Sequence, residues 1–221
     1  MNQKINFDSI VKNQEIKTYL EFTDKAFLRM GFREQGRSHA RYASERAGQV
    51  LSQLGFSPRE QDLAKTAAYL HDIGNVISRG DHARVGAIMF LSLLDEKDYD
   101  EDVYTIATAI GNHEDKNTEP VSIVAAAVVL GDKTDVRHER LRTDETKNSD
   151  KYSKVIASCR RTDLVVNKEA KTISLIIEID TKICSVMDYF EIFIDRTNFC
   201  RRASHVLGCE FQLYINEDKL L

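Results

Sequence analysis

The period of the apolar residues changes towards the C-terminal end of this 221-residue chain. Between about residues 13 and 137, apolar side chains recur at steps of three and four, which is the spacing of amphipathic helices. Beyond residue 163 the pattern includes alternation with a period of two, which is typical of half-buried strands. The sequence therefore predicts a mainly α chain, in which a helical bundle is followed by a small C-terminal α+β appendage.

Start and stop signals divide the first part into separate helices. Ser57, Pro58 and Glu60 combine an N-cap, a proline at the first helical position and the acidic residue of a capping box. Gly55 is the type of residue that ends the helix before them. The predicted helices run from Asn13 to Gly31, from Ser38 to Leu54, from Ser57 towards His71, and at about 82–95, 100–112 and 120–137.

A polar segment, Thr143–Asp150, separates the helical part from the tail. In the tail, Ile173–Ile179 alternates in polarity, and Leu164–Val166 offers a partner strand across a turn near Asn167. A long helix that ends before Gly208 and a last strand follow, so the tail is predicted as β-β-α-β. The expected domains are a helical metal-binding domain at 1–142, a linker or connecting helix at 143–162 and a small α+β domain at 163–221.

Composition excludes several classes of protein. The 31 basic and 35 acidic side chains leave a net charge of −4, so no strong field for nucleic acid or an anionic membrane is expected. The longest apolar run, Val121–Leu130, is shorter than the about 20 residues that cross a bilayer. The first residues lack the apolar stretch of a signal peptide, which predicts a cytoplasmic protein. The cysteines have no metal-finger spacing and are expected to be reduced packing residues: Cys159, Cys184, Cys200 and Cys209.

Imidazoles and carboxylates are spread over the successive predicted helices, beside small or apolar neighbours. A helical bundle can bring such residues to one interior point. Nitrogen and carboxylate ligands suit Fe, Mn, Zn or Co, and six of them are too many for one site that leaves room for substrate. We therefore expect two divalent transition-metal ions, with Asp72 as the best bridging ligand because its two oxygens can serve two ions. The candidate ligands are His39, His71, Asp72, His82, His113 and Asp132.

Each of these residues also has an ordinary structural interpretation. A His-Asp dipeptide can cap a helix end, His113 can sit at the negative end of a helix dipole, and Asp132 can close a helix. The whole ordered set favours function, because burying these groups without partners would be costly.

The same residues resemble the HD-domain metal-dependent phosphohydrolases over about Ser38–Arg140. The segment Ala67–Gly74 (Ala-Ala-Tyr-Leu-His-Asp-Ile-Gly) looks like the motif that gives the family its name, in its HDIG form. Four other segments resemble the remaining ligand segments of the two-metal subgroup: Ser38–Ala43, His82–Ala87, Ala109–His113 and Leu130–Lys133. The resemblance implies that one metal is held by His39, His71, Asp72 and Asp132, and that Asp72 bridges to a second metal held by His82 and His113.

The resemblance also implies a mechanism. Two cations lower the pKa of a bridging water and clamp a phosphate oxygen, so a nucleotide or related small phosphate ester is cleaved by a metal-activated water, with Asp72 as the central catalytic residue. Lys133 and Arg137, one helical turn apart, are expected to bind the substrate phosphates, although both also suit surface salt bridges. Arg41, Arg79 and Arg84 are weaker candidates. Asp135 is expected to be an outer hydrogen-bond or salt-bridge partner.

Some alternatives stay open at this point. Asn75 after the HDIG motif and Asn112 before His113 disfavour the cyclic-di-GMP phosphodiesterase branch. A diiron oxygenase with the same ligand set and a non-catalytic nucleotide-sensing module are the two other function classes. The resemblance does not reach the tail, for which packing or self-association into a homo-oligomer is the simplest role.

Overall fold

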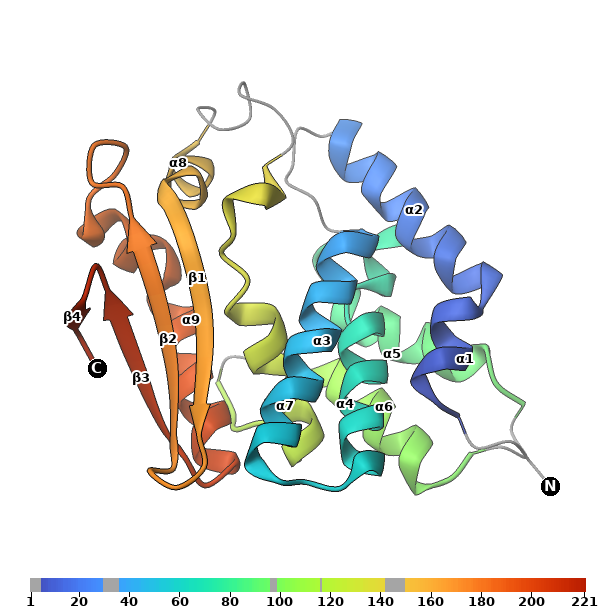
Figure 1. Cartoon of the computed structure of the whole chain (residues 1–221). Helices are drawn as coiled ribbons and strands as arrows, with labels where there is room; N and C mark the ends of the chain where they lie inside the picture. Colours follow the sequence, from blue (N-terminus) through green and yellow to red (C-terminus); the bar gives the residue numbers. More distant parts are fainter. Residues whose placement is uncertain (1–4, 30–35, 96–98, 116, 142–149) are drawn as a thin grey trace.

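The structure is a computed structural model, which describes residues 5–29, 36–95, 99–115, 117–141 and 150–221. Figure 1 shows a helical part beside a small twisted sheet. The helical part contains α1 (Phe7–Lys12), α2 (Gln14–Arg29), α3 (Arg37–Leu54), α4 (Pro58–Leu70), η1 (Ile73–Val76), α5 (His82–Ser92), α6 (Glu101–Asn112), α7 (Ile123–Lys133) and η3 (His138–Arg140). The C-terminal part contains α8 (Lys151–Ser158), β1 (Cys159–Asn167), β2 (Thr172–Ile179), α9 (Val186–Val206), β3 (Glu210–Ile215) and β4 (Asp218–Lys219). The predicted fold class, mainly α with a C-terminal β part, is confirmed.

Side-chain caps make several of the predicted helix starts, whereas α3 and α5 begin without one. The Asn13 side chain accepts hydrogen bonds from the backbone N–H groups of Glu15 and Ile16, at 2.8 and 3.1 Å. The capping box of Ser57 and Glu60 is formed. Gly55, at φ +88°, adopts the left-handed conformation that ends α3. The expected end of the first helix, at Gly31, lies outside the described residues.

The predicted helix at 120–137 is shorter in the structure, where α7 spans Ile123–Lys133. The Ser122 hydroxyl accepts from the Ala125 N–H at 3.1 Å, which makes Ser122 the N-cap and leaves Val121 exposed before the helix. At the other end the Thr134 hydroxyl donates to the Leu130 carbonyl at 2.6 Å, where the chain leaves the helix. The short helix α1 was not predicted.

Helix α7 is the centre of the helical part. All but its first residue are buried, and it packs against α3, α4, α6 and α9. A methyl group at Gly131 would lie 2.4 Å from the Ala43 carbonyl oxygen, so glycine allows α3 to approach closely. The buried α7 carries Asp132 and Lys133 in its last turn.

The C-terminal part forms a sheet with strand order β1-β2-β3-β4. The predicted hairpin is present, with Leu164 opposite Leu175 in the antiparallel β1–β2 pair. Strands β2 and β3 are parallel, and α9 makes the connection between them. The predicted β-β-α-β order is thus confirmed, and a short β4 follows it. The domain division stays a prediction: residues 142–149 lie outside the described ranges, α8 lies within the expected connector, and β1 begins at Cys159.

Two further findings concern the cysteines and membrane-spanning helices. The four cysteines are free and buried, as expected for packing residues. No helix in the described part of the chain is long and apolar enough to span a membrane.

Candidate metal centre

The structure brings the six predicted metal ligands together at the ends of five helices. His39 lies in the first turn of α3, His71 and Asp72 follow α4, and His82 opens α5. His113 follows α6, and Asp132 lies in the last turn of α7. Their donor atoms form three overlapping groups that can hold a metal ion, each with its atoms within 4.8 Å of one another. All six side chains except His82 are buried.

The Asp72 carboxylate lies between two sets of histidines. Its Oδ2 is 3.4 Å from His71 Nε2 and 3.8 Å from His39 Nε2. Its Oδ1 is 3.2 Å from His82 Nε2 and 4.0 Å from His113 Nε2. Each oxygen of one carboxylate therefore faces a different pair of imidazoles, which is the arrangement of a bridging ligand.

Asp132 completes the group around His39 and His71. Its Oδ1 is 3.3 Å from His39 Nε2 and 3.8 Å from His71 Nε2. Its Oδ2 instead forms an ion pair with Lys133 Nζ at 2.7 Å. One oxygen of Asp132 thus faces the histidines and the other is held by a cation.

Hydrogen bonds on the outer ring nitrogens orient the histidines. The Nδ1 atoms of His71, His82 and His113 lie 2.6, 2.8 and 2.7 Å from the carbonyl oxygens of the residues three positions earlier. His39 Nδ1 lies 2.8 Å from Asp135 Oδ2. Each outer nitrogen can therefore act as the donor, so that an Nε2 atom free of its proton directs its lone pair to the centre, as in metal-binding histidines.

His71 provides the direct test of whether these residues fit a metal. Its Nε2 is buried and has no hydrogen-bond partner in the described structure. A buried polar atom without a partner is costly and unusual in a native protein. A cation among His71, Asp72 and Asp132 would satisfy it, so the donor set fits divalent metal ions.

The charges of the centre shift the pKa values of its groups. Burial alone would lower the pKa of His71, but Asp72 and Asp132 outweigh it and raise the pKa to about 9. Burial, with help from His71 and Lys133, lowers the pKa of His113 to about 3. Burial would raise the pKa of Asp72, yet His71 and the neighbouring histidines hold it well below its usual range. The carboxylates are therefore ionised and require positive charge beside them.

Lys133, predicted to bind substrate, is buried in this centre. Its Nζ lies 2.7 Å from Asp132 Oδ2 and 2.5 Å from Glu114 Oε1. The ammonium group therefore bridges two carboxylates and offsets their negative charge inside the protein. Glu114 was not identified from the sequence, because a glutamate after a helix end carries no pattern.

Arg137, the second predicted substrate-binding residue, contacts other groups. Its Nε lies 2.7 Å from Asp135 Oδ1, and its guanidinium stacks 3.3 Å from the centre of the Tyr42 ring. The Asp135 carboxylate is fully buried and contacts both Arg137 and His39, the hydrogen-bond and salt-bridge contacts expected for it, while its position outside the metal ligands stays a prediction. The substrate-binding role of Arg137 stays a prediction.

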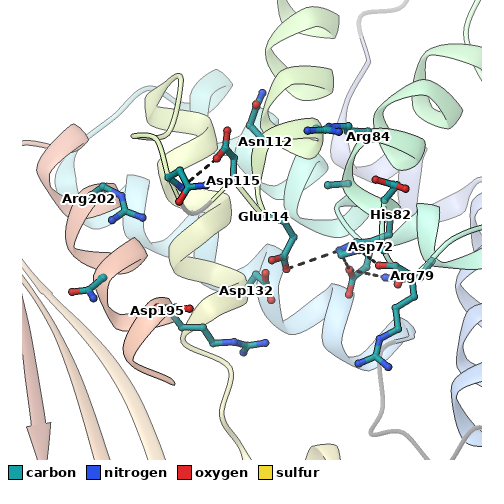
Figure 2. A pocket seen from close by; sticks show the side chains of 18 of the residues that line it. Asp72, Arg79, His82, Arg84, Asn112, Glu114, Asp115, Asp132, Asp195 and Arg202 are labelled. Atoms are coloured by element: carbon teal, nitrogen blue, oxygen red, sulfur yellow. Dashed lines mark hydrogen bonds and ion pairs between the residues drawn. The ribbon is translucent and has the colours of Figure 1, made fainter. Parts of the chain in front are cut away.

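A cavity of about 810 Å³ opens beside the metal centre. Asp72, His82 and Asp132 form its floor, and neither Lys133 nor Arg137 is part of its lining. In Figure 2, Arg79, Arg84 and His82 lie on one side and Asp195 and Arg202 on the other. Among the described residues that line this cavity are four arginines: Arg79, Arg84, Arg196 and Arg202. The last two come from α9 and were not identified, because sequence alone does not show against which surface the tail helix packs.

Comparison with known proteins agrees with this centre. The family model described as HD domain matches residues 36–156, which include all six candidate ligands. The chain is also 28% identical over 184 residues to an uncharacterized protein of the archaeon Methanocaldococcus jannaschii, covering 73% of this chain and 71% of that protein.

Proposed function

Because the chain belongs to the HD-domain family, whose members are generally metal-dependent phosphohydrolases, we propose that it hydrolyses a phosphate ester of a nucleotide or a related small molecule. The observation that carries the proposal is the position of Asp72. Its two carboxylate oxygens face two different pairs of histidines, which a single structural ion would not require.

The residues present would hold two divalent transition-metal ions, Fe, Mn, Co or Zn. His39, His71, Asp72 and Asp132 would hold one ion, and Asp72, His82 and His113 the other. When bound, the two ions would supply Lewis acidity and lower the pKa of a water for attack on phosphorus. No protein nucleophile is required, and Asp72 acts by fixing the spacing of the two sites.

The other residues keep the centre ionised and in place. Lys133 compensates the charge of Asp132 and Glu114, so that Asp132 stays deprotonated and available on its other oxygen. Asp135 fixes the ring of His39 and is itself held by Arg137. These contacts indicate that Lys133 and Arg137 hold the charged groups of the site in place. Their contact with substrate phosphates is a separate prediction.

The cavity supports a small anionic substrate. Its volume of about 810 Å³ lies within the range of about 300–1,000 Å³ found for small-molecule sites. Its described lining is polar and includes four arginines and six carboxylates, of which Asp72 and Asp132 are candidate metal ligands. Phe27 is the one Phe, Tyr or Trp side chain among the described lining residues. Absence of nucleic-acid and membrane partners, self-association through the tail and a cytoplasmic location all stay predictions.

The test is a panel of phosphate monoesters and nucleotides, assayed under strict anaerobiosis with Mn, Co, Zn, Fe and Mg in ¹⁸O-labelled water. We expect release of phosphate or nucleoside monophosphate with Mn or Co, and ¹⁸O in the product. The Asp72→Asn variant, which removes the bridging charge, is the matched inactive control. Activity confined to iron and dependent on dioxygen would instead identify an oxygenase, and nucleotide binding without turnover would identify a sensing module.

A further inference from the structure

One wall of the cavity comes from the C-terminal part of the chain. Of the lining residues, four belong to α9, which lies beyond the residues 36–156 that match the family. Helix α9 also packs against α7, which carries Asp132. The tail is thus part of the enclosure of the metal centre. The four residues are Asp195, Arg196, Asn198 and Arg202.

Arg196 is half-buried, and its guanidinium forms no ion pair with the residues that the structure describes. Its Nη1 is buried and finds no hydrogen-bond acceptor there. The guanidinium lies 5.3 Å from the Phe193 ring and 5.9 Å from the Tyr152 ring, contacts that position it but do not neutralise it. Leaving such a donor unsatisfied is costly, so the position favours a bound anion.

Arg196 is also electrostatically coupled to the metal centre. Burial would lower its pKa, but Tyr152, Asp132 and Glu114 raise it above its ordinary value. The guanidinium therefore stays charged within electrostatic reach of two carboxylates of the centre. A phosphate bound at the metals would meet this charge from the α9 side.

Arg202 extends the basic wall along the helix. It lies six residues after Arg196, a rise of about 9 Å along the axis. Its Nε donates to the Thr118 carbonyl at 3.2 Å, which fixes the side chain against the loop before α7. Figure 2 shows Arg202 on the same side of the cavity as Asp195, farther from the metal centre than Asp132. The two arginines thus spread positive charge along a stretch of α9 that is longer than one phosphate group.

We propose that Arg196 and Arg202 form a second-phosphate subsite, supplied by the C-terminal part, and that the substrate carries at least one phosphate besides the one at the metals. This inference rests on the proposed function for the position of the first phosphate. It gives the tail a role in substrate recognition, whereas packing or self-association was the simplest expectation from the sequence.

Calorimetry with matched probes tests the subsite. The full chain is titrated with adenosine 5′-monophosphate, adenosine 5′-diphosphate and adenosine 3′,5′-bisphosphate, once loaded with manganese and once stripped of metal so that no ester turns over. We expect at least one probe with two phosphates to bind more tightly than the monophosphate. The Arg202→Gln variant should lose about 10- to 100-fold of affinity for that probe and little for the monophosphate, as expected for a lost charged hydrogen bond.

Two further variants complete the design. Arg196→Gln should weaken all three probes, Arg196→Lys should restore part of the loss, and thermal unfolding reports whether each variant is folded. Arg160→Gln is the control: it removes the same charge from the same part of the chain, at an exposed site on β1 where Arg160 pairs with Asp180 at 3.0 Å.

The outcomes separate this inference from the proposed function. If Arg202→Gln and Arg160→Gln bind the probes alike, or no probe gains from its second phosphate, the subsite is refuted even when the chain hydrolyses phosphate esters. If the selective loss is found but the panel shows no hydrolysis, the subsite stands and the hydrolase assignment fails.

Discussion

His71 holds a proton that a metal ion must displace. In the metal-free chain its pKa is raised to about 9, because Asp72 and Asp132 outweigh the effect of burial. At neutral pH the imidazolium therefore supplies part of the positive charge that the carboxylates require. Metal binding replaces this proton, so it should release protons to solvent.

The raised pKa makes the stability of the metal-free chain dependent on pH. A raised pKa stabilises the fold fully below the unfolded value of 6.5, and this stabilisation is lost as the pH rises through about 9. We therefore expect the free energy of unfolding of the metal-free chain to fall between pH 6.5 and 9. Urea denaturation across this range measures it, with His71→Asn as the variant that should flatten the dependence. A stability that is constant or rises over the range would contradict the assignment.

Asp132 and Asp135 should differ in the effect of the same substitution. Asp132 faces two histidine Nε2 atoms, whereas Asp135 contacts His39 only through the outer Nδ1. Asp135→Asn should weaken metal binding by about 10- to 100-fold, the usual effect of losing an outer hydrogen bond. Asp132→Asn should empty the site and abolish activity. Equal and mild losses of metal and activity in the two variants would contradict the assignment of Asp132 as a metal ligand and Asp135 as an outer partner.

At the residue scale, the sequence alone predicted the site residues that belong to a recognisable motif. It did not predict the site residues that lie outside one. The six candidate ligands stand in segments whose spacing and residue types are unusual, and the structure brings them together. Arg196 and Arg202 stand in an ordinary amphipathic helix, where an arginine is equally compatible with solvent. Burial of Lys133 was also not predictable, because it depends on Glu114 approaching from another helix end.

At the scale of elements, the turn after α4 positions the histidine of the proposed second metal site. A methyl group at Gly74 would lie 2.0 Å from the His82 carbonyl oxygen and 2.5 Å from the Gly86 nitrogen, both in α5. The glycine of the HDIG motif therefore allows α5 to pack directly on η1. This contact places His82 beside Asp72.

Gly74→Ala should disturb both stability and the second metal site. Neither backbone atom can move without displacing α5, so we expect a loss of about 1–3 kcal/mol in the free energy of unfolding. Because α5 carries His82, binding of the second metal should weaken as well. Gly80→Ala is the matched control, since a methyl group there meets nothing within 4 Å. If both variants keep wild-type stability and metal content, this account of the turn is wrong.

The element boundaries were predictable where a local cap made them. Asn13, Gly55 and Ser57 each end or start a helix through their own side chain or backbone conformation. The end of α7 was not predicted, because Thr134 and Asp135 are as compatible with a helix as their neighbours. Their contacts with Arg46 and His39 come from α3, which is distant in sequence.

At the scale of the whole molecule, the helical part and the sheet share buried contacts. Arg46 of α3 donates to the Thr134 hydroxyl at 3.0 Å and to the Thr162 carbonyl of β1 at 2.8 Å. Helix α9 packs on both the sheet and α7, and Figure 1 shows it behind the strands of the sheet. Because of these shared contacts we expect the two parts to unfold together, although the hydrophobic pattern of the sequence predicted separate domains.

The shared contacts predict a single unfolding transition. Differential scanning calorimetry of the metal-free full chain should show one peak, and Arg46→Gln should lower its midpoint without dividing it. Loss of these buried hydrogen bonds from a charged group should lower the free energy of unfolding by about 1–3 kcal/mol. This corresponds to a fall of about 2–12 °C in the unfolding midpoint of a chain of this size. Two resolved peaks, one insensitive to Arg46→Gln, would show that the two parts unfold independently.

The central claim is that Asp72 joins two metal sites, and metal analysis of purified variants tests it most directly. The wild-type chain should hold two transition-metal ions, the His82→Ala/His113→Ala double variant should hold one, and Asp72→Ala should hold none. His138→Ala, which changes a half-buried histidine beside Glu139, should keep both. Full retention of metal after changing His82 and His113 together would contradict the two-metal account.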